Sequence, residues 1–133
     1  MTANLLSLKK LGWKGDGGNI PAAYLIGLVC GKEAKKKWVR EAVADFGLHP
    51  STKWSRLAAA LKGAVDSGLQ VPHSPDILPP VDRLTGKHIA VYAEKLRNES
   101  PEKYKKDFSS YLNSSLPPED LMKHMEEIKK KIV

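Results

Sequence analysis

The clearest chemistry in this 133-residue chain lies in one loop, from His49 to Arg56, whose sequence is His-Pro-Ser-Thr-Lys-Trp-Ser-Arg. Hydroxyl groups, cations and a helix start stand together there, and this combination binds phosphate well because N–H groups at a helix start point toward the anion. The side chains concerned are those of Ser51, Thr52, Lys53, Ser55 and Arg56. An ordinary capping turn with solvated charges has the same composition, so the residues alone leave both interpretations open.

Two further basic segments precede predicted helices. Residues 9–19 combine flexible glycines with one tryptophan and three lysines, namely Trp13, Lys9, Lys10 and Lys14. Phosphate could lie on the following helix N-terminus, with Trp13 either stacked on a base or, at least as readily, packed inward. The turn over residues 83–88 either contacts RNA through Arg83 and Lys87 or only orients the tail, and the two interpretations are equally balanced.

Signals for catalysis, nucleotides and metals are weak or absent in the sequence. Both Gly-Lys dipeptides are followed by the wrong residue for a Walker motif, Glu33 in one case and His88 in the other. The four histidines lack a paired metal-ligand spacing, and Cys30 is a lone cysteine in an apolar helix. We therefore expect no catalytic residue, no metal site, no cofactor and no small-molecule substrate.

The formal net charge of +7 is concentrated in the first half of the chain. Residues 1–63 hold 11 Lys/Arg against 4 Asp/Glu, whereas residues 85–133 hold 10 against 8. Such a region attracts a polyanion through counterion release, although a solubilising face has the same composition. A single cysteine fits a reducing compartment, and the apolar run around residues 21–30 is too short for a bilayer span. We expect a cytoplasmic protein without a membrane partner.

Proline and hydrophobic patterning indicate the elements that position these segments. Pro21 starts a helix whose residues 22–33 are apolar on most faces, so this helix needs cover on more than one side. Residues 39–46 alternate in polarity, which predicts one short strand. Because a lone strand leaves its ladder bonds unpaired, something outside this chain would have to complete the sheet.

The second half of the chain reads as helices joined by a stiff connector. One helix begins near Thr52 or Ser55 and ends at Gly68, and its small residues let it lie close against a sheet or RNA. Residues 71–80 hold four of the nine prolines and form the connector. Three helices follow, with apolar stripes at Ile89, Tyr92, Ala93 and Leu96, at Tyr104, Phe108, Tyr111 and Leu112, and at Leu121, Met125, Ile128 and Ile132.

The order of these pieces carries a family resemblance. Residues 12–31 read GWKGDGGNIPAAYLIGLVCG, and residues 47–93 read GLHPSTKWSRLAAALKGAVDSGLQVPHSPDILPPVDRLTGKHIAVYA. With the tail at 100–132, these stretches closely resemble the archaeal-type branch of the large-subunit ribosomal protein L-eighteen family, whose eukaryotic relatives are called L-five. The likeness covers nearly the whole chain from near Leu8.

The resemblance implies an α/β (α+β) fold, the C-terminal part of a sheet-plus-helices RNA-binding domain followed by a helical C-terminal extension. With the connector, it divides the chain into a partial α/β RNA-binding domain at 1–71, a proline-rich connector at 72–83 and the helical extension at 84–133. The family places the loop at 49–56 against ribosomal RNA. The expected RNA contacts are Lys9, Lys10, Trp13, Lys14, Ser51, Thr52, Lys53, Trp54, Ser55, Arg56, Lys62, Arg83 and Lys87.

In function, the resemblance implies a structural constituent of the large ribosomal subunit that binds 5S rRNA and helps seat it in the central protuberance. Its expected partners are 5S rRNA, large-subunit rRNA and neighbouring ribosomal proteins. The alternative is a protein–protein adaptor or a ribosome assembly factor with weak RNA affinity. A small enzyme has no support in the residues.

The chain departs from the family in two respects. Family members carry a basic arm and several antiparallel strands before the segment that matches Leu8, and this part supplies the rest of the sheet and a major 5S rRNA contact. In addition, Trp38 and Trp54 stand where the family usually has glycine. Trp54 could stack on a base, or it could block a close backbone approach that glycine permits.

Overall fold

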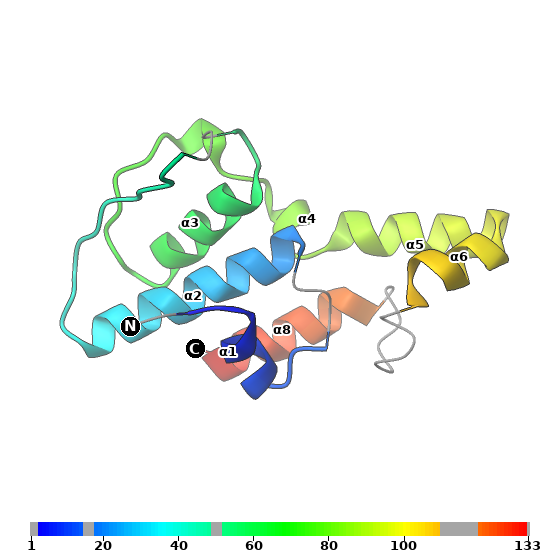
Figure 1. Cartoon of the computed structure of the whole chain (residues 1–133), viewed down its shortest axis with the longest axis horizontal. Coiled ribbons are helices and arrows are strands. Elements are labelled where there is room, and N and C mark those ends of the chain that lie inside the picture. The colour runs from blue at the N-terminus through cyan, green and yellow to red at the C-terminus, as the bar shows by residue number, and fades with distance from the viewer. Residues whose placement is uncertain (1–2, 15–17, 49–51, 110–119, 133) are drawn as a thin grey trace.

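The fold is a set of packed helices rather than a sheet covered by helices. The computed structural model describes residues 3–14, 18–48, 52–109 and 120–132, and these ranges contain no β-strand (Figure 1). The expected α/β (α+β) class is therefore wrong. The elements are α1 (Leu5–Lys10), α2 (Ile20–Lys36), α3 (Arg56–Asp66), a 3-10 turn η1 (Pro75–Ile77), α4 (Val81–Leu84), α5 (Lys87–Glu99), α6 (Pro101–Asp107) and α8 (Leu121–Ile132).

Residues 39–46 form an irregular segment with one bridge where we expected a strand. Glu41 and Gln70 make an isolated parallel bridge. The Ala42 N–H donates to the Gln70 carbonyl at 2.9 Å, and the Gln70 N–H donates to the Arg40 carbonyl at 2.9 Å. The alternation of polarity has the period of a strand, but a ladder needs a partner at successive residues. The segment around Gln70 supplies such a partner only once.

The helix α2 is the centre of the molecule, and it begins as predicted. Asn19 caps it by accepting the Ala22 N–H at 3.0 Å, and Pro21 lies in the first turn. Ala22 and Gly27, which are five residues apart and so lie on nearly opposite sides of the helix, are both buried. The predicted need for cover on more than one side is met by α1, α3, α4 and α8, all of which contact α2 (Figure 1).

The helix α3 lies closest to α2 because glycines face the contact from both helices. Ser55 caps α3 by accepting the Ala58 N–H at 3.2 Å, one of the two caps that we expected. A Cβ atom at Gly27 would lie 2.0 Å from the Ala60 carbonyl oxygen, and one at Gly63 would lie 2.1 Å from the Tyr24 carbonyl oxygen. The small residues thus bring α3 against another helix rather than against a sheet.

The three helices predicted after the connector correspond to α5, α6 and α8 among the described residues, and the short α4 precedes them. In α8 all four residues of the predicted stripe are buried, and in α5 Ala93 and Leu96 are buried whereas Tyr92 is half exposed. Tyr104 and Phe108 pack beside α5, which α6 contacts as a neighbour (Figure 1). Ser100 precedes α6 without a side-chain capping bond. Tyr111 and Leu112 lie outside the described residues.

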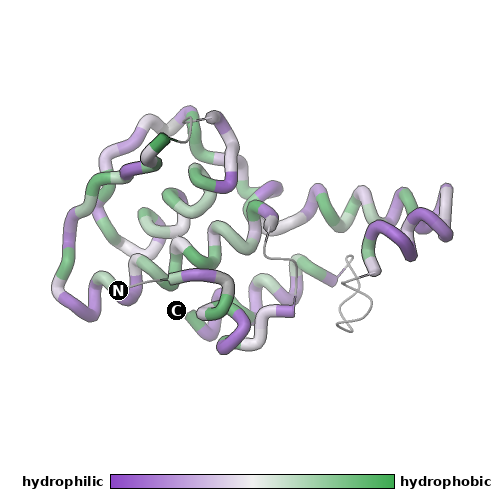
Figure 2. The backbone as a smooth tube through the Cα atoms, viewed as in Figure 1, coloured by the Kyte–Doolittle hydropathy of each residue, from purple (hydrophilic) through white to green (hydrophobic). Residues whose placement is uncertain are grey.

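One hydrophobic core joins the two ends of the chain. It includes Leu8 and Trp13 near the start, Leu25 in α2, and Leu121 and Ile128 in α8. Figure 2 shows hydrophobic residues along the middle of α2 and a mostly hydrophilic α6. Among the described helices, none has both the length and the apolar character needed to cross a bilayer.

Candidate nucleic-acid interface

Two basic turns that are distant in the sequence meet on the ring of Trp54. The Lys53 ammonium lies 5.6 Å from the ring centroid, and the Arg83 guanidinium carbon lies 5.8 Å from it. Trp54 is 42% exposed as a residue, and both cations stand beside its ring. Cations over a tryptophan ring are attracted by its quadrupole. We call Lys53, Trp54 and Arg83 the Trp54 cluster.

Two hydrogen bonds tie the loop that carries Lys53 and Trp54 to the connector and to the residue before the α2 cap. The Trp54 N–H donates to the Ile77 carbonyl at 2.9 Å, which ties the loop to the connector. The Arg56 guanidinium donates to the Gly18 carbonyl at 3.4 Å, one residue before the cap of α2. Lys87 lies near the same turn as Arg83, with its ammonium 4.0 Å from Asp82 in a solvent-exposed pair.

The hydroxyl groups of the loop have different environments. The Ser55 hydroxyl already accepts the Ala58 N–H, so it serves the helix cap. Thr52 is exposed on the surface. Ser51 lies outside the described residues. Of the two hydroxyl residues of the loop that the structure describes, Thr52 is thus open to solvent and Ser55 serves the helix cap.

The backbone is left-handed at Trp38 and Trp54, the two positions where the resemblance implies glycine. Trp38 has φ of 64° and Trp54 has φ of 60°, and among the described residues no other non-glycine residue has a positive φ. Side chains with a Cβ atom are strained in this left-handed region, whereas glycine adopts it freely. Trp54 thus combines a strained backbone with a partly exposed ring.

Trp13 is buried in the core, whereas Lys14 has an exposed side chain and is tied to the core only through its backbone. The Trp13 ring is 4% exposed and stacks on the His124 ring, with centroids 5.1 Å apart. The backbone N–H of Lys14 donates to Nε2 of His124 at 2.9 Å. Sequence reasoning missed His124, since a lone histidine at a helix face carries no metal or catalytic spacing.

The remaining predicted contacts are not part of the Trp54 cluster. Lys9 and Lys10 are exposed in the last turn of α1. The Lys62 ammonium lies 2.8 Å from Asp66, which also accepts the Tyr24 hydroxyl at 2.6 Å. Burial, followed by that hydrogen bond to Asp66, raises the pKa of Tyr24 above its usual range. Lys62 is thus already paired with a carboxylate.

The predicted candidates also omitted a second group of lysines, in α2 and α8. Lys32, Lys36 and Lys37 line a pocket of about 400 Å³ together with Lys10 and Lys131. The run at residues 35–37 is visible in the sequence, but its meeting with the C-terminal lysines depends on how α8 packs. Within the described residues, no group of three or more histidine, cysteine, aspartate or glutamate side chains could hold a metal ion.

Comparison with known proteins identifies the relatives of this chain. It is 53% identical over 126 residues to the large ribosomal subunit protein uL18 of Caldivirga maquilingensis, covering 95% of this chain and 61% of that protein. It is 54% identical over 125 residues to uL18 of Aeropyrum pernix, covering 94% of this chain and 58% of that protein. The chain thus spans less than two thirds of the length of these curated relatives, and no family model matches it.

These alignments extend over 95% and 94% of the chain and confirm the resemblance inferred from its motifs. Over the part of those proteins that it spans, this chain belongs to the uL18 family of large ribosomal subunit proteins.

Proposed function

We propose that this chain is an RNA-binding structural constituent of the large ribosomal subunit in the cytoplasm, without enzymatic activity. Its relatives at 53% and 54% identity are named as large-subunit proteins, which supports the ribosomal assignment. The finer part of the proposal is that it binds 5S rRNA and helps seat it in the central protuberance, beside large-subunit rRNA and neighbouring proteins. The observation that carries RNA binding is the meeting of two basic turns on the exposed ring of Trp54.

The mechanism that we propose is electrostatic positioning. Lys53, Arg56 and Arg83 neutralise phosphates, and such contacts fix the orientation of a protein on RNA without selecting a base sequence. The open part of the Trp54 ring provides a surface on which an unpaired base can stack. Residues 1–71 would carry most of these contacts, residues 72–83 would connect, and residues 84–133 would form the helical extension.

A salt titration tests the proposal. The chain is titrated with a 5S rRNA transcript at several salt concentrations, and the logarithm of the binding constant is plotted against the logarithm of salt concentration. Replacing Lys53 and Arg56 together with alanine should flatten the slope by roughly one to two units, because each lost phosphate contact removes somewhat less than one unit.

The matched control removes two lysines from α6, as Lys105→Ala with Lys106→Ala, and should leave the slope close to that of the parent chain. An unchanged slope in the Lys53→Ala, Arg56→Ala variant would remove the loop from the interface. Weak binding without salt dependence in the parent chain would favour the adaptor or assembly-factor alternative instead.

A further inference from the structure

A second basic surface lies where α1, α2 and α8 end. Two adjoining pockets share Lys32 and Ile132. The first, of about 400 Å³, is also lined by Lys10, Lys36, Lys37 and Lys131. The second, of about 440 Å³, is also lined by Lys35 and Lys129. We call these seven side chains the lysine face: Lys10, Lys32, Lys35, Lys36, Lys37, Lys129 and Lys131.

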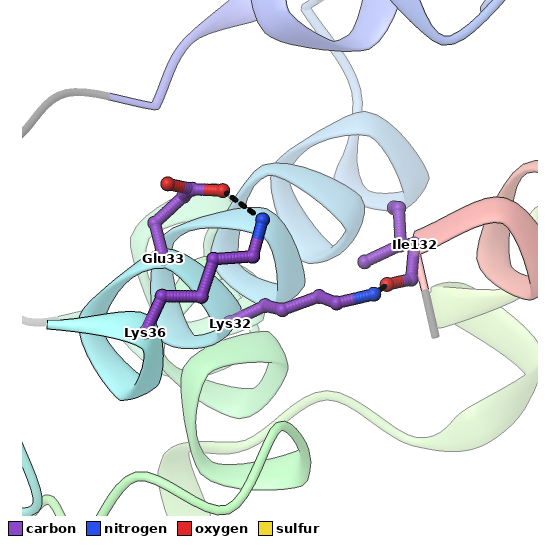
Figure 3. Close-up of polar contacts among 4 residues, drawn as sticks. All are labelled: Lys32, Glu33, Lys36 and Ile132. Atoms are coloured by element: carbon purple, nitrogen blue, oxygen red, sulfur yellow. Dashed lines mark hydrogen bonds and ion pairs between the residues drawn. The ribbon is translucent and has the colours of Figure 1, made fainter. Parts of the chain in front are cut away.

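Some of these lysines are already used to hold the helix ends together. The Lys32 ammonium donates to the Ile132 carbonyl, and Lys36 pairs with Glu33 at 3.1 Å (Figure 3). The Lys131 ammonium donates to the Leu11 carbonyl at 3.2 Å. In the part of the chain that the structure describes, Lys10, Lys35 and Lys37 have no hydrogen bond or ion pair from their ammonium groups.

Helix dipoles do not account for so many cations. Lysines near a helix C-terminus offset roughly half a negative elementary charge per helix, so three helix ends require about one and a half charges. The carboxylates that line the two pockets are those of Glu33 and Asp66. Seven lysines against these charges leave a surplus of roughly three to four positive charges at this surface.

The lysine face is separate from the Trp54 cluster. Arg56 contacts the carbonyl of Gly18 and so places the cluster beside the start of α2, whereas Lys35, Lys36 and Lys37 stand at its end. A helix rises about 1.5 Å per residue, so the 17 residues of α2 separate the two surfaces by roughly 25 Å. One phosphate group cannot contact both.

We propose that the lysine face is a second RNA-binding surface, which contacts phosphates roughly 25 Å along the same RNA from those at the Trp54 cluster. This inference rests on the proposed function. A phosphate backbone suits the surface because lysine ammonium groups bind phosphate as point charges without choosing a base. An acidic protein partner fits less well, since lysine is depleted in protein–protein interfaces and their centres are apolar and aromatic.

The test replaces three lysines of the face that are exposed at the end of α2, as Lys35→Gln, Lys36→Gln and Lys37→Gln in the full chain. The probe is the 5S rRNA transcript, and the slope of affinity against salt should fall by about two units. The variant with arginine at the same three positions keeps the charge and should keep the slope. Circular dichroism confirms that each variant retains its helices.

Parallel measurements separate the failure of this inference from that of the proposed function. If Lys53→Ala with Arg56→Ala flattens the slope and the glutamine variant does not, the lysine face is not an RNA surface although the proposed function stands. If the parent chain shows no salt-dependent RNA binding, both proposals fail. Both chains are also titrated with polyglutamate, which stands in for an acidic protein. If the glutamine substitutions weaken binding to polyglutamate but not to RNA, the surface recognises an acidic protein, which also overturns the inference.

A footprint gives a second readout that a loss of stability would not imitate. Lysine acetylation is mapped on the parent chain with and without the 5S rRNA transcript. Protection of Lys35, Lys36 and Lys37 by RNA supports the proposal, and equal acetylation in both samples contradicts it.

Discussion

At the scale of single residues, the two unusual tryptophans show what sequence comparison can and cannot reveal. The sequence shows tryptophan at positions 38 and 54, but the left-handed conformation that favours glycine there is visible only in the backbone. Trp38 follows the last residue of the α2 cap, its N–H donates to the Lys35 carbonyl at 3.0 Å, and the Val39 N–H donates to the Ala34 carbonyl at 2.9 Å. This is the Schellman arrangement, in which the left-handed residue is usually glycine.

Replacing Trp38 with glycine should therefore stabilise the fold. The left-handed conformation costs a residue with a Cβ atom about 1–2 kcal/mol, and glycine avoids this cost. The greater conformational freedom of glycine in the unfolded chain offsets about 0.5–1 kcal/mol of that gain. The Trp38 ring is 85% exposed, so little packing is lost. We expect a gain of about 0.5–1 kcal/mol in the free energy of unfolding, measured by urea denaturation.

Trp38→Ala provides the control for this prediction, because it removes the same ring and keeps the Cβ atom. It should show little of the gain. Equal stability of the alanine and glycine variants would mean that backbone strain at Trp38 is not the cause.

At the scale of helices, sequence patterns predicted those elements whose packing needs one apolar stripe. The stripe of α8 is buried as predicted, and Gly68 has the left-handed φ of 101° expected at the end of α3. The helices α1 and α4 were missed because their six and four residues are too short for a periodic signal. The strand at residues 39–46 was wrong because alternation describes a single segment, whereas a strand depends on a partner.

The pairing of elements could not be predicted in the same way. The residue types of α3 indicated a close approach to another surface, but nothing in them identified α2. The Trp54 cluster is a similar case, since Lys53 and Arg83 come together only when the connector folds back along the loop. The residue types of the Trp54 cluster are thus visible in the sequence, whereas their meeting depends on tertiary structure.

The contact between α2 and α3 makes Gly63 a sensitive position. In Gly63→Ala the new Cβ atom would lie 2.1 Å from the Tyr24 carbonyl oxygen and 2.8 Å from the Leu28 nitrogen, both of which are backbone atoms. The helices would have to move apart, at a cost of about 1–3 kcal/mol or more for an overpacked contact. We expect a lower urea midpoint for this variant.

Alanine has a better helix propensity than glycine by about 1 kcal/mol, so a stabilised Gly63→Ala variant would show that the two helices separate easily. The control is Lys36→Ala, a surface change on α2 that should alter stability by no more than about 0.5 kcal/mol.

At the scale of the whole molecule, the beginning and the end of the chain close the core on each other. His124 in α8 stacks on Trp13 and accepts the N–H of Lys14, across 110 residues of sequence. Lys131 reaches the carbonyl of Leu11 in the same region. The C-terminal helix is thus a structural part of the core around α2, and its lysines are held beside those of α2 for that reason.

This closure should make stability depend on pH. Burial lowers the pKa of His124 below its ordinary value of 6.5, and the nearby charges of Lys14 and Lys131 act in the same direction against an opposing effect of Glu127. Burial, with Arg83 nearby, also lowers the pKa of His88. The folded chain therefore binds a proton less readily than the unfolded chain. The stability that the two neutral histidines contribute is therefore complete above their ordinary pKa, and it is lost as the pH falls below that value.

We expect the melting temperature to decrease as the pH is lowered from about 8 to about 5.5. Histidine is the main side chain that titrates in this range. Protonated His124 could no longer accept the Lys14 N–H, so acid removes the bond that joins the N-terminal segment to α8. In His124→Gln an amide oxygen can still accept that bond without titrating. This variant should melt with a weaker dependence on pH, the remainder coming from His88. If it shows the full dependence of the parent chain, His124 is not the group that couples protonation to the closure of the molecule.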